Sequence, residues 1–447
     1  MKLTRLTLAI PLLLAATGVA AGQGSDGIFP FGFREVRLDN GFRAYLIKAG
    51  APGQIAYVSM VRTGSRDEVE DGKSGFAHFF EHIMFRGTDK YPNYDGITSR
   101  MGAARNAFTS NDMTVYYLVA ASEYLEQIAD LESDRFMHLR YSESDFRTEA
   151  GSILGEYQQS ATTPMGFFNE KVRETAYDRH TYRHTTIGYE DDVRAMPEGY
   201  VYSLAFHRRF YRPENVVLVI AGDFDEARAE AIIRRYYAAW SPGYAAPAVP
   251  AEPAQTSPRR RTVSYAGRTL PVLSVSHKGP AWSANDRLAA ATELLGAVAF
   301  GRNSDLYKRL VLQERKVQSL NAGFGLSRDA GLLTVTAMVI NPADLQYVEA
   351  AILETARAFQ ERPADARLLQ DIKSNQKYGF LMGLETAQDV AFAMIPFAVN
   401  TGRIETVNDY YGMLDAVTAE DVQAAARRYL TENGRTVVTM VQQEGSR

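Results

Sequence analysis

Three residues within one five-residue stretch have the types and the spacing of a hydrolytic metal site: His78, Glu81 and His82. If residues 75–86 form a helix, the two histidines stand four positions apart, so both imidazoles leave the same face and can bind one metal ion. Glu81 lies beside them without having to be a ligand, and it can take a proton from a water molecule at the metal. The alternative is two surface histidines and a solvated glutamate.

A third protein ligand is expected from a separate element, because two histidines alone hold zinc poorly. A helix is predicted from near Ser144, and Glu149 and Glu156 lie two turns apart on one side of it. One carboxylate can ligate the metal while the other accepts a hydrogen bond from a ligand imidazole. Spacing alone does not choose between them, and two ordinary solvated glutamates are the alternative. The apolar face of this helix is formed by Phe146, Ala150, Ile153, Leu154 and Tyr157.

Two parts of the chain repeat one another's order of predicted elements. A strand over residues 55–61 precedes the motif helix, and a strand over residues 270–276 precedes a helix around residues 286–298. Each part ends with a helix that runs into a strand, at residues 207–220 and 422–440. Mixed strands and helices with such a repeat predict an α+β fold of two homologous halves, each an antiparallel-rich sheet with helices packed on it.

A Pro- and Ala-rich stretch separates these parts. Residues 241–261 lack apolar periodicity and are predicted to be an extended linker that ends in the solvated run Arg259-Arg260-Arg261. We therefore expect a signal peptide at residues 1–21, a catalytic zinc-binding α+β domain at 22–240 and an inert α+β repeat domain at 262–447.

The second part cannot repeat the metal motif. If Phe85 is set against Phe300, the second part presents a different set of side chains at the three motif positions. The residues opposite His78, Glu81 and His82 are then Glu293, Gly296 and Ala297. Glycine and alanine side chains carry no ligand atoms, so we expect one active half and one inert half.

Composition and charge set the broad class of the protein. The chain has 447 residues, of which 46% are hydrophobic, and this is enough material for more than one sizeable core. Its net charge of −4 gives no basis for nucleic-acid binding. It contains no cysteine, which excludes disulfides and thiol catalysis.

The N-terminus has the pattern of an export signal. Lys2 and Arg5 precede an apolar run over residues 6–14, and Val19-Ala20-Ala21 is a small-residue cleavage site. The run is too short for a comfortable bilayer span, so no membrane span is expected in the mature chain; a retained N-terminal anchor is the alternative. The lack of cysteine suits an oxidising compartment. These features predict a bacterial periplasmic protein.

The motif and its surroundings resemble a known family. His78-x-x-Glu81-His82 followed by Glu156 is similar to the inverted-zincin metallopeptidases, the family of pitrilysin, insulin-degrading enzyme and mitochondrial processing peptidase. The stretch from Asn106 to Ser110 resembles the N-A-x-T strand of this family, and residues 206–215 resemble its F-x-x-x-Y-x-P-x-N segment. The resemblance runs across nearly the whole mature chain.

By this resemblance, one Zn²⁺ per chain is bound by His78, His82 and Glu156, with the family spacing selecting Glu156 over Glu149 as the ligand. Glu81 becomes the general base, and Glu149 becomes the carboxylate that orients a ligand imidazole. The implied activity is that of a zinc metalloendopeptidase that hydrolyses peptide bonds in peptides or unfolded segments.

The resemblance also implies where a peptide lies. In this family the substrate adds to an exposed sheet edge, and the matching residues are Asn106, Ala107 and Phe108. A plain core strand is the alternative. His180-Thr181-Tyr182 stands where family members often carry a similar His-x-Tyr near the substrate.

One departure from the family concerns its substrate-binding arginine and tyrosine in the second half. The paired positions are Val311 and Gln318 here, and Arg302 with Tyr307 has the wrong spacing. The chain therefore resembles the catalytic subunit of a heterodimer whose homologous, non-catalytic subunit supplies the Arg/Tyr pair; a homodimer is the alternative.

Two other functions compete with a general peptidase. The family includes non-enzymatic assembly subunits, but these typically lose a metal ligand or the base, and all four residues are present here. A protease dedicated to the maturation of one precursor shares the same chemistry, and neither composition nor motif separates it from a peptidase of broad specificity.

Overall fold

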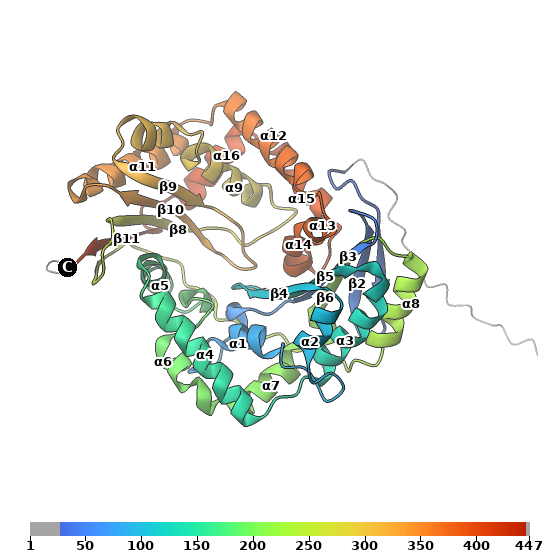
Figure 1. The fold of residues 1–447 in the computed structure, drawn as a ribbon. Coiled ribbons are helices and arrows are strands. Elements are labelled where there is room, and N and C mark those ends of the chain that lie inside the picture. The colour runs from blue at the N-terminus through green and yellow to red at the C-terminus, as the bar shows by residue number, and fades with distance from the viewer. Residues whose placement is uncertain (1–26, 444–447) are drawn as a thin grey trace, which may run out of the picture.

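The computed structural model describes residues 27–443 and contains two sheets with helices packed on both faces (Figure 1). The expected signal peptide at residues 1–21 lies outside the described residues. The predicted α+β class with two similar halves is confirmed, since each half holds one mixed sheet and its own set of helices. No helix within residues 27–443 is both long and apolar enough to cross a bilayer.

The first sheet has six strands in the order β1-β2-β6-β3-β5-β4, with β4 at one edge. Neighbouring strands are antiparallel except for β2 and β6, which are parallel. The strands are β1 (Phe33–Arg37), β2 (Arg43–Lys48), β3 (Gln54–Val61), β4 (Ala104–Thr109), β5 (Thr114–Ala121) and β6 (Val216–Gly222).

The second sheet has five strands in the order β7-β11-β8-β10-β9, and its only parallel pair is β7 with β11. The position of β9 at its edge corresponds to that of β4 in the first sheet. The strands are β7 (Arg259–Tyr265), β8 (Val272–Lys278), β9 (Val317–Gly323), β10 (Leu332–Val339) and β11 (Arg435–Gln442).

The helices follow the same order in both halves, so that the α1 helix after β3 corresponds to the α9 helix after β8. The helices of the first half are α1 (Phe76–Ile83), α2 (Tyr94–Arg100), α3 (Leu125–His138), α4 (Glu143–Ala161), α5 (Pro164–Ala176), α6 (Glu190–Ala195), α7 (Tyr200–Phe210) and α8 (Glu226–Tyr237). Those of the second half are α9 (Arg287–Phe300), α10 (Asp305–Tyr307), a π-helical turn (Lys308–Gln313), α11 (Leu345–Glu361), α12 (Ala366–Met382), α13 (Ala387–Ala393), α14 (Ile395–Thr401), α15 (Thr406–Ala416) and α16 (Ala419–Tyr429).

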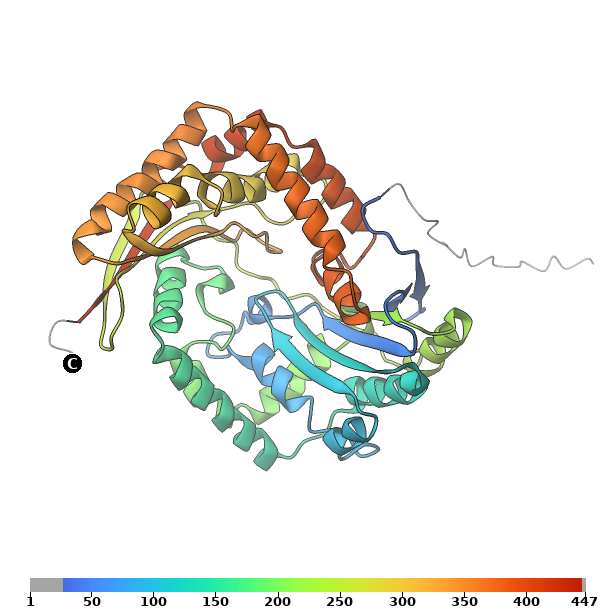
Figure 2. The ribbon, with the colours of Figure 1, turned by 45° about the horizontal axis from the view of Figure 1, so that its top comes forward.

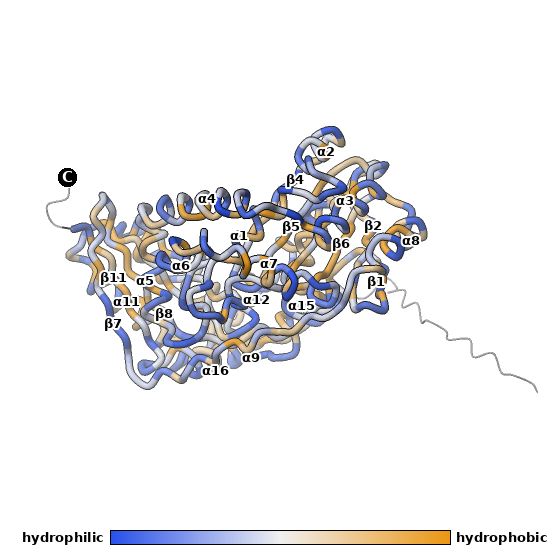
Figure 3. The backbone as a smooth tube through the Cα atoms, turned by 90° about the horizontal axis from the view of Figure 1, so that it is seen from below, coloured by the Kyte–Doolittle hydropathy of each residue, from blue (hydrophilic) through white to orange (hydrophobic). Residues whose placement is uncertain are grey.

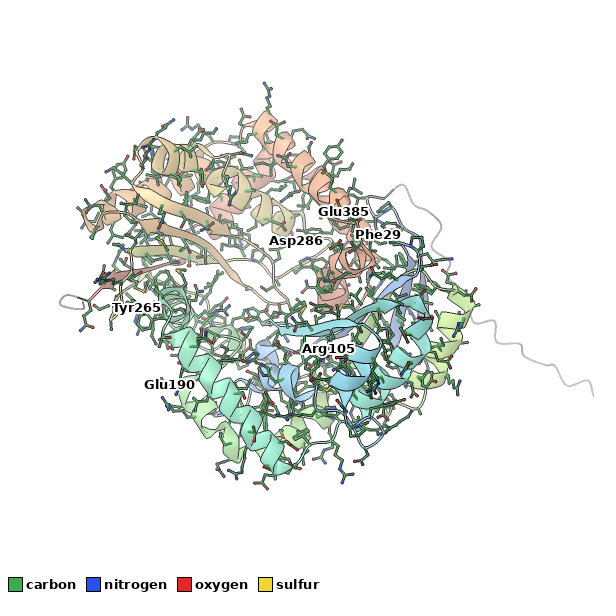
Figure 4. All side chains as sticks on the ribbon, in the orientation of Figure 1. Phe29, Arg105, Glu190, Tyr265, Asp286 and Glu385 are labelled. Atoms are coloured by element: carbon green, nitrogen blue, oxygen red, sulfur yellow. The ribbon has the colours of Figure 1, made fainter. Side chains whose placement is uncertain are left out.

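One helix of each half packs on the sheet of the other half. Helix α5 of the first half packs on β11, β7 and β8, where Phe168 and Val172 contact Val272 and Met440. Figure 4 labels Tyr265 beside this contact, at the end of β7. Reciprocally, α13 of the second half packs on β3 and β6 (Figure 2). The two halves therefore share apolar contacts on both sheets, and neither sheet is covered by its own half alone.

The prediction that the linker extends to residue 261 was wrong. Arg259, Arg260 and Arg261 are not part of an extended linker; they begin β7, which pairs in parallel with β11. Arg260 and Arg261 are nevertheless exposed, as expected for a solvated run. Their guanidinium groups form ion pairs with carboxylates of α5, α11 and the segment after α5: Arg259 with Asp178, Arg260 with Glu349 and Arg261 with Glu174. A basic run is compatible with an edge strand, because charged side chains discourage further pairing.

Candidate metal centre

Helices α1 and α4 bring His78, His82 and Glu156 together. His78 Nε2 lies 3.5 Å from Glu156 Oε2, and His82 Nε2 lies 3.5 Å from Glu156 Oε1. Zinc bonds of about 2.1 Å in tetrahedral geometry separate neighbouring ligand atoms by about 3.4 Å. The three side chains therefore fit a zinc ion. Within residues 27–443 they are the only group of three or more histidines and carboxylates that could hold a metal ion, with one ligand atom of each lying within 4.8 Å of the others.

The motif helix is amphipathic and begins at a glycine. Gly75 has φ of 93°, and a Cβ at this position would lie 2.4 Å from the Ile187 carbonyl oxygen, so glycine is required. One face of α1 is buried against the sheet and α7, and the other face presents His78 and His82 to α4. The buried face consists of Phe76, Ala77, Phe79, Phe80 and Ile83.

Helix α4 presents both glutamates and is itself fixed by a capping box at Ser142. Its apolar side is buried and its other side is polar, which Figure 3 shows as alternating hydrophobic and hydrophilic segments along the helix. Glu149 and Glu156 lie two turns apart and face α1, as the sequence spacing predicted. The structure separates the two carboxylates: Glu156 lies between the Nε2 atoms, and Glu149 contacts the opposite side of one imidazole.

Glu149 fixes the orientation of His82. Its Oε1 lies 3.0 Å from His82 Nδ1, and its Oε2 accepts a hydrogen bond from Arg86 Nη2 at 2.8 Å. These two partners hold the pKa of Glu149 below its usual range, mainly through the hydrogen bond with His82. An ionised carboxylate can only accept, so His82 Nδ1 carries a hydrogen, and in the neutral imidazole Nε2 carries the lone pair that can bind a metal.

His78 and Glu81 differ from their solution behaviour because both are largely buried. Burial, with a smaller effect of the neighbouring His82, lowers the pKa of His78 to about 4, so its imidazole is neutral at pH 7, the form that ligates metal. His78 Nδ1 is buried and has no hydrogen-bond partner among the described residues. Burial also raises the pKa of Glu81, whose Oε2 lies 4.0 Å from His78 Nε2. A carboxylate with a raised pKa is suited to general-base work near neutral pH.

A buried carboxylate caps the N-terminus of the motif helix. Glu68 accepts hydrogen bonds from the backbone N–H of Gly75 at 2.8 Å and of Ala77 at 2.6 Å. It is almost fully buried, and burial raises its pKa while the two N–H donors oppose that rise. A carboxylate satisfies the orphan N–H groups at a helix start and complements the positive end of the helix dipole. The sequence reasoning missed Glu68.

The C-terminal end of the motif helix is held by donors from the core. The Tyr116 hydroxyl donates to the Phe80 carbonyl at 2.8 Å, and Arg135 Nη1 donates to the Met84 carbonyl at 3.3 Å. Arg135 is buried and pairs with Glu132 at 2.7 Å. The sequence reasoning missed this support as well, because Arg135 comes from a helix far along the chain and nothing local marks it.

The three predicted substrate residues lie on β4, at the edge of the first sheet. Their strand pairs with β5 on one side and with no strand among residues 27–443 on the other. Asn106 is exposed and lines a cavity of about 500 Å³ that also reaches His82 and Glu149. Ala107 is buried, and the Phe108 ring packs on Phe392 of α13. The backbone edge is thus open, while only the first of the three side chains faces the cavity.

The two positions that depart from the family pattern carry uncharged side chains. Val311 is half-buried in the π-helical turn and packs against the second core, and Gln318 is exposed on β9. The second half also lacks a metal group among the described residues: Glu293 accepts a hydrogen bond from the Tyr410 hydroxyl, and Gly296 packs against Phe324.

His180 has other partners than a substrate. Its Nε2 lies 2.9 Å from Asp329 of the second half, and its Nδ1 accepts a hydrogen bond from the Tyr182 N–H at 3.0 Å. The Tyr182 hydroxyl donates to Asp112 at 2.6 Å and accepts a hydrogen bond from the Asp329 N–H of the second half at 3.2 Å. Both side chains of this His-x-Tyr segment therefore take part in the contact between the halves.

Comparison with known families accounts for most of the chain. The family described as Insulinase (Peptidase family M16) matches residues 46–190, which include every member of the metal group. The Peptidase M16 inactive domain matches residues 203–376, which lie mostly in the second half. The match of the inactive-domain model to the later part of the chain agrees with the absence of a metal group among the described residues of the second half.

Individual proteins agree with these matches. Zinc protease PqqE from Helicobacter pylori is 27% identical over 416 residues, covering 90% of this chain and 91% of that protein. The crystal structure of a protease from Helicobacter pylori is similar with a TM-score of 0.85 and 24% identity, covering 91% of this chain and 99% of that one.

A second solved structure is twice as long. The periplasmic protease PqqL from Escherichia coli is similar with a TM-score of 0.75 and 19% identity. The matched region covers 96% of this chain and 49% of that one. At these identities the solved structures establish the fold, and the family matches establish the kinship. The chain therefore belongs to peptidase family M16, the insulinase family, as its reversed zinc motif led us to expect.

Proposed function

We propose that this chain is an active zinc endopeptidase in which His78, His82 and Glu156 bind one Zn²⁺ and Glu81 is the general base. The observation that carries the proposal is the position of Glu156, which lies 3.5 Å from the Nε2 atom of each histidine. Non-enzymatic family members typically lose a ligand or the base, whereas this chain retains the complete set. We further propose that the catalytic domain ends at residue 240 and that the second domain begins with β7, at Arg259.

A bound zinc ion supplies a Lewis acid that activates water and polarises the scissile carbonyl. The side chains of the protein transfer the proton of the attacking water and orient the metal ligands. Glu81 accepts the proton of the attacking water and later delivers it to the departing amine nitrogen. Glu149 holds His82 in the tautomer that leaves Nε2 free, and its contact with Arg86 keeps it ionised for that role.

The proposed substrate is a peptide or an unfolded segment. The open edge of β4 passes beside α1, so an extended chain can add to the sheet there and bring its backbone past the metal ligands. Asn106, Ala107 and Phe108 are the strand residues that such a chain would pair with. A folded protein cannot adopt this extended form, which favours short or flexible substrates. A protease dedicated to one precursor remains the second candidate with the same chemistry.

We also propose that the chain works as the catalytic subunit of a heterodimer. Val311 and Gln318 cannot replace a guanidinium and a phenol, so a homologous subunit without the zinc motif would supply them. Full activity of the purified chain alone would contradict this arrangement and favour a homodimer. An export signal at residues 1–21 and the periplasmic character stated for PqqL support a periplasmic location.

The central experiment is the Glu81→Gln substitution. The variant should keep one zinc per chain, measured by atomic absorption, and lose peptide hydrolysis by at least about 100-fold, because only the proton acceptor is removed. Glu123→Gln, at an exposed position away from the site, is the matched control and should keep full activity. Retained hydrolysis in Glu81→Gln would contradict the assignment, and zinc binding without hydrolysis in the unmodified chain, with or without a partner, would favour an assembly role.

A further inference from the structure

A second cavity lies where helix α5 of the first half meets the sheet of the second half. Its volume is about 450 Å³, and it is separate from the cavity beside the metal ligands. Polar side chains from both halves line it: Asn111, Asn169 and Arg173 from the first, and Ser274, Thr334 and Thr336 from the second. Because α5 otherwise makes apolar contacts with this sheet, a polar space at its centre calls for an explanation.

Strand alternation places the hydroxyl groups in this space. On β8, Leu273 and Val275 point into the apolar core that is shared by both halves. Ser274 therefore points to the opposite face of the sheet, toward α5. On β10, Val335 and Ala337 likewise belong to the core, which leaves Thr334 and Thr336 on the face of α5. The row of hydroxyls is thus built into two adjacent strands and faces a single cation.

That cation is Arg173, whose guanidinium is satisfied on one side only. Its Nη1 donates to Asn111 Oδ1 at 3.3 Å, to the Tyr182 carbonyl at 3.1 Å and to the His184 carbonyl at 3.4 Å. All three acceptors are neutral. Among residues 27–443, none accepts a hydrogen bond from Nε or Nη2, and no carboxylate lies within ion-pair distance.

The unsatisfied edge has a definite chemical preference. Nε and Nη2 form the fork of an arginine, which matches the two oxygens of a carboxylate in a bidentate pair. Burial lowers the pKa of Arg173, and the nearby Tyr177, Tyr182 and Asp112 side chains only partly oppose that effect. Nε and Nη2 of Arg173 are not among the buried polar atoms that lack a partner, so this edge is accessible to a ligand from the cavity. Arg66, nearby in the same contact between the halves, already has two carboxylate partners.

The cavity begins close to the end of β4, the edge strand of the proposed active site. Asn111, which binds Arg173, belongs to the turn that directly follows β4. A peptide that extended along β4 past Thr109 would therefore approach Asn111, which lines this cavity. We propose, on the basis of the proposed peptidase function, that the cavity binds a carboxylate of the peptide substrate through Nε and Nη2 of Arg173. Such a carboxylate comes from an acidic side chain or from the C-terminus.

The test measures binding in the full-length Glu81→Gln chain, where no turnover intervenes. The probes are fluorescein-labelled neutral decapeptides with a single Glu moved along the sequence, their Gln counterparts, and each peptide as C-terminal acid or amide. Fluorescence anisotropy should give at least one matched pair in which the carboxylate form binds about tenfold or more tightly. A Glu-over-Gln preference assigns a side chain, and an acid-over-amide preference assigns the C-terminus.

Two further substitutions test whether the preference for a carboxylate depends on Arg173. Arg173→Met removes the fork, and Asn169→Asp places an internal carboxylate one turn before Arg173 on α5, where it can occupy the fork without loss of the fold. Both should reduce the preference to less than twofold, with the thermal midpoint of Asn169→Asp unchanged or higher. Arg179→Met, at an exposed position nearby, should retain it.

The inference is overturned if no peptide pair shows a preference, if none of the peptides binds, or if either Arg173→Met or Asn169→Asp retains the preference. Hydrolysis by the unmodified chain is measured separately. A lack of hydrolysis counts against the peptidase proposal. The carboxylate preference and its dependence on Arg173 still show whether this cavity binds a carboxylate.

Discussion

Arg66 in the first half and Asp329 in the second half form an ion pair in which Arg66 Nε lies 2.6 Å from Asp329 Oδ2. The same carboxylate lies 2.9 Å from His180 Nε2. Since His180 Nδ1 accepts the Tyr182 N–H, its Nε2 carries the hydrogen and donates to Asp329. These contacts join the turn between β9 and β10 to the segment after α5. Both lie close to β4, the strand that we propose binds substrate.

Asp329→Asn should loosen this fastening. The amide removes one of the two negative charges beside Arg66 and leaves Asp67 as its remaining ion-pair partner. The free energy of unfolding is expected to fall by about 1–3 kcal/mol, between the values typical of surface and buried pairs. Urea denaturation followed by circular dichroism measures the change. Asp71→Asn, at an exposed position without an ion pair, is the control and should alter stability by less than about 0.5 kcal/mol.

The same carboxylate predicts a pH dependence. The hydrogen bond from His180 and the ion pair with Arg66 hold the pKa of Asp329 below its usual range. The stabilisation is therefore fully present above the unfolded-state pKa of about 3.9 and is lost as the pH falls toward the lower pKa of the folded state. Denaturation curves between pH 6 and the acid limit should lose stability less steeply in Asp329→Asn than in the unmodified chain. Equal slopes would contradict this account.

Local patterns predicted the parts of the site that lie on one helix. The four-residue spacing of His78 and His82 and the seven-residue spacing of Glu149 and Glu156 follow from helix geometry, so the sequence could place each pair on one face. The choice of Glu156 as ligand required the family resemblance, because both carboxylates lie on the same side of α4. The structure separates them by the side of His82 that each one contacts.

The supports of the site could not be predicted, because they are tertiary contacts. Glu68 precedes α1 by a loop, and its carboxylate meets the helix start only after the chain turns at Gly75. Arg135 reaches Met84 from α3 with no periodic or motif signal. The arginine run that begins β7 was assigned to a linker for the same reason: its partners on β11 lie at the other end of the chain.

Glu68→Gln tests the role of the buried cap. The side-chain amide keeps the shape but offers one acceptor oxygen for two N–H groups and removes the charge at the helix start. We expect the zinc affinity to fall about tenfold, because α1 carries two of the three proposed ligands and its position is less well fixed. Competition with a chromophoric chelator measures the affinity without reference to activity. Unchanged affinity in Glu68→Gln, with Glu123→Gln as control, would show that the cap does not position α1.

Glu149 and Glu156 should respond differently to the same substitution. Glu156→Gln removes a proposed ligand and should leave little zinc bound after dialysis against a weak chelator. Glu149→Gln leaves the proposed ligand set intact and only weakens the orientation of His82, so the zinc affinity should fall by about 10- to 100-fold. Zinc titration of both variants distinguishes the roles, and a reversed order of the two losses would exchange the assignments.

The reciprocal docking of α5 and α13 predicts that neither half folds alone. Residues 27–257 without the second half would expose the face of the first sheet that α13 covers, where Val58 and Val219 belong to the core shared by both halves. Residues 258–443 would likewise lose α5 from the face that carries Val272 and Met440. Large apolar faces of this kind promote association rather than independent folding. Each fragment expressed alone should bind a hydrophobic dye and lack a cooperative thermal transition, and co-expression of the two should restore both the transition and zinc binding. A cooperative transition in the isolated first fragment would contradict the prediction and would mean that its sheet is stable without the second half.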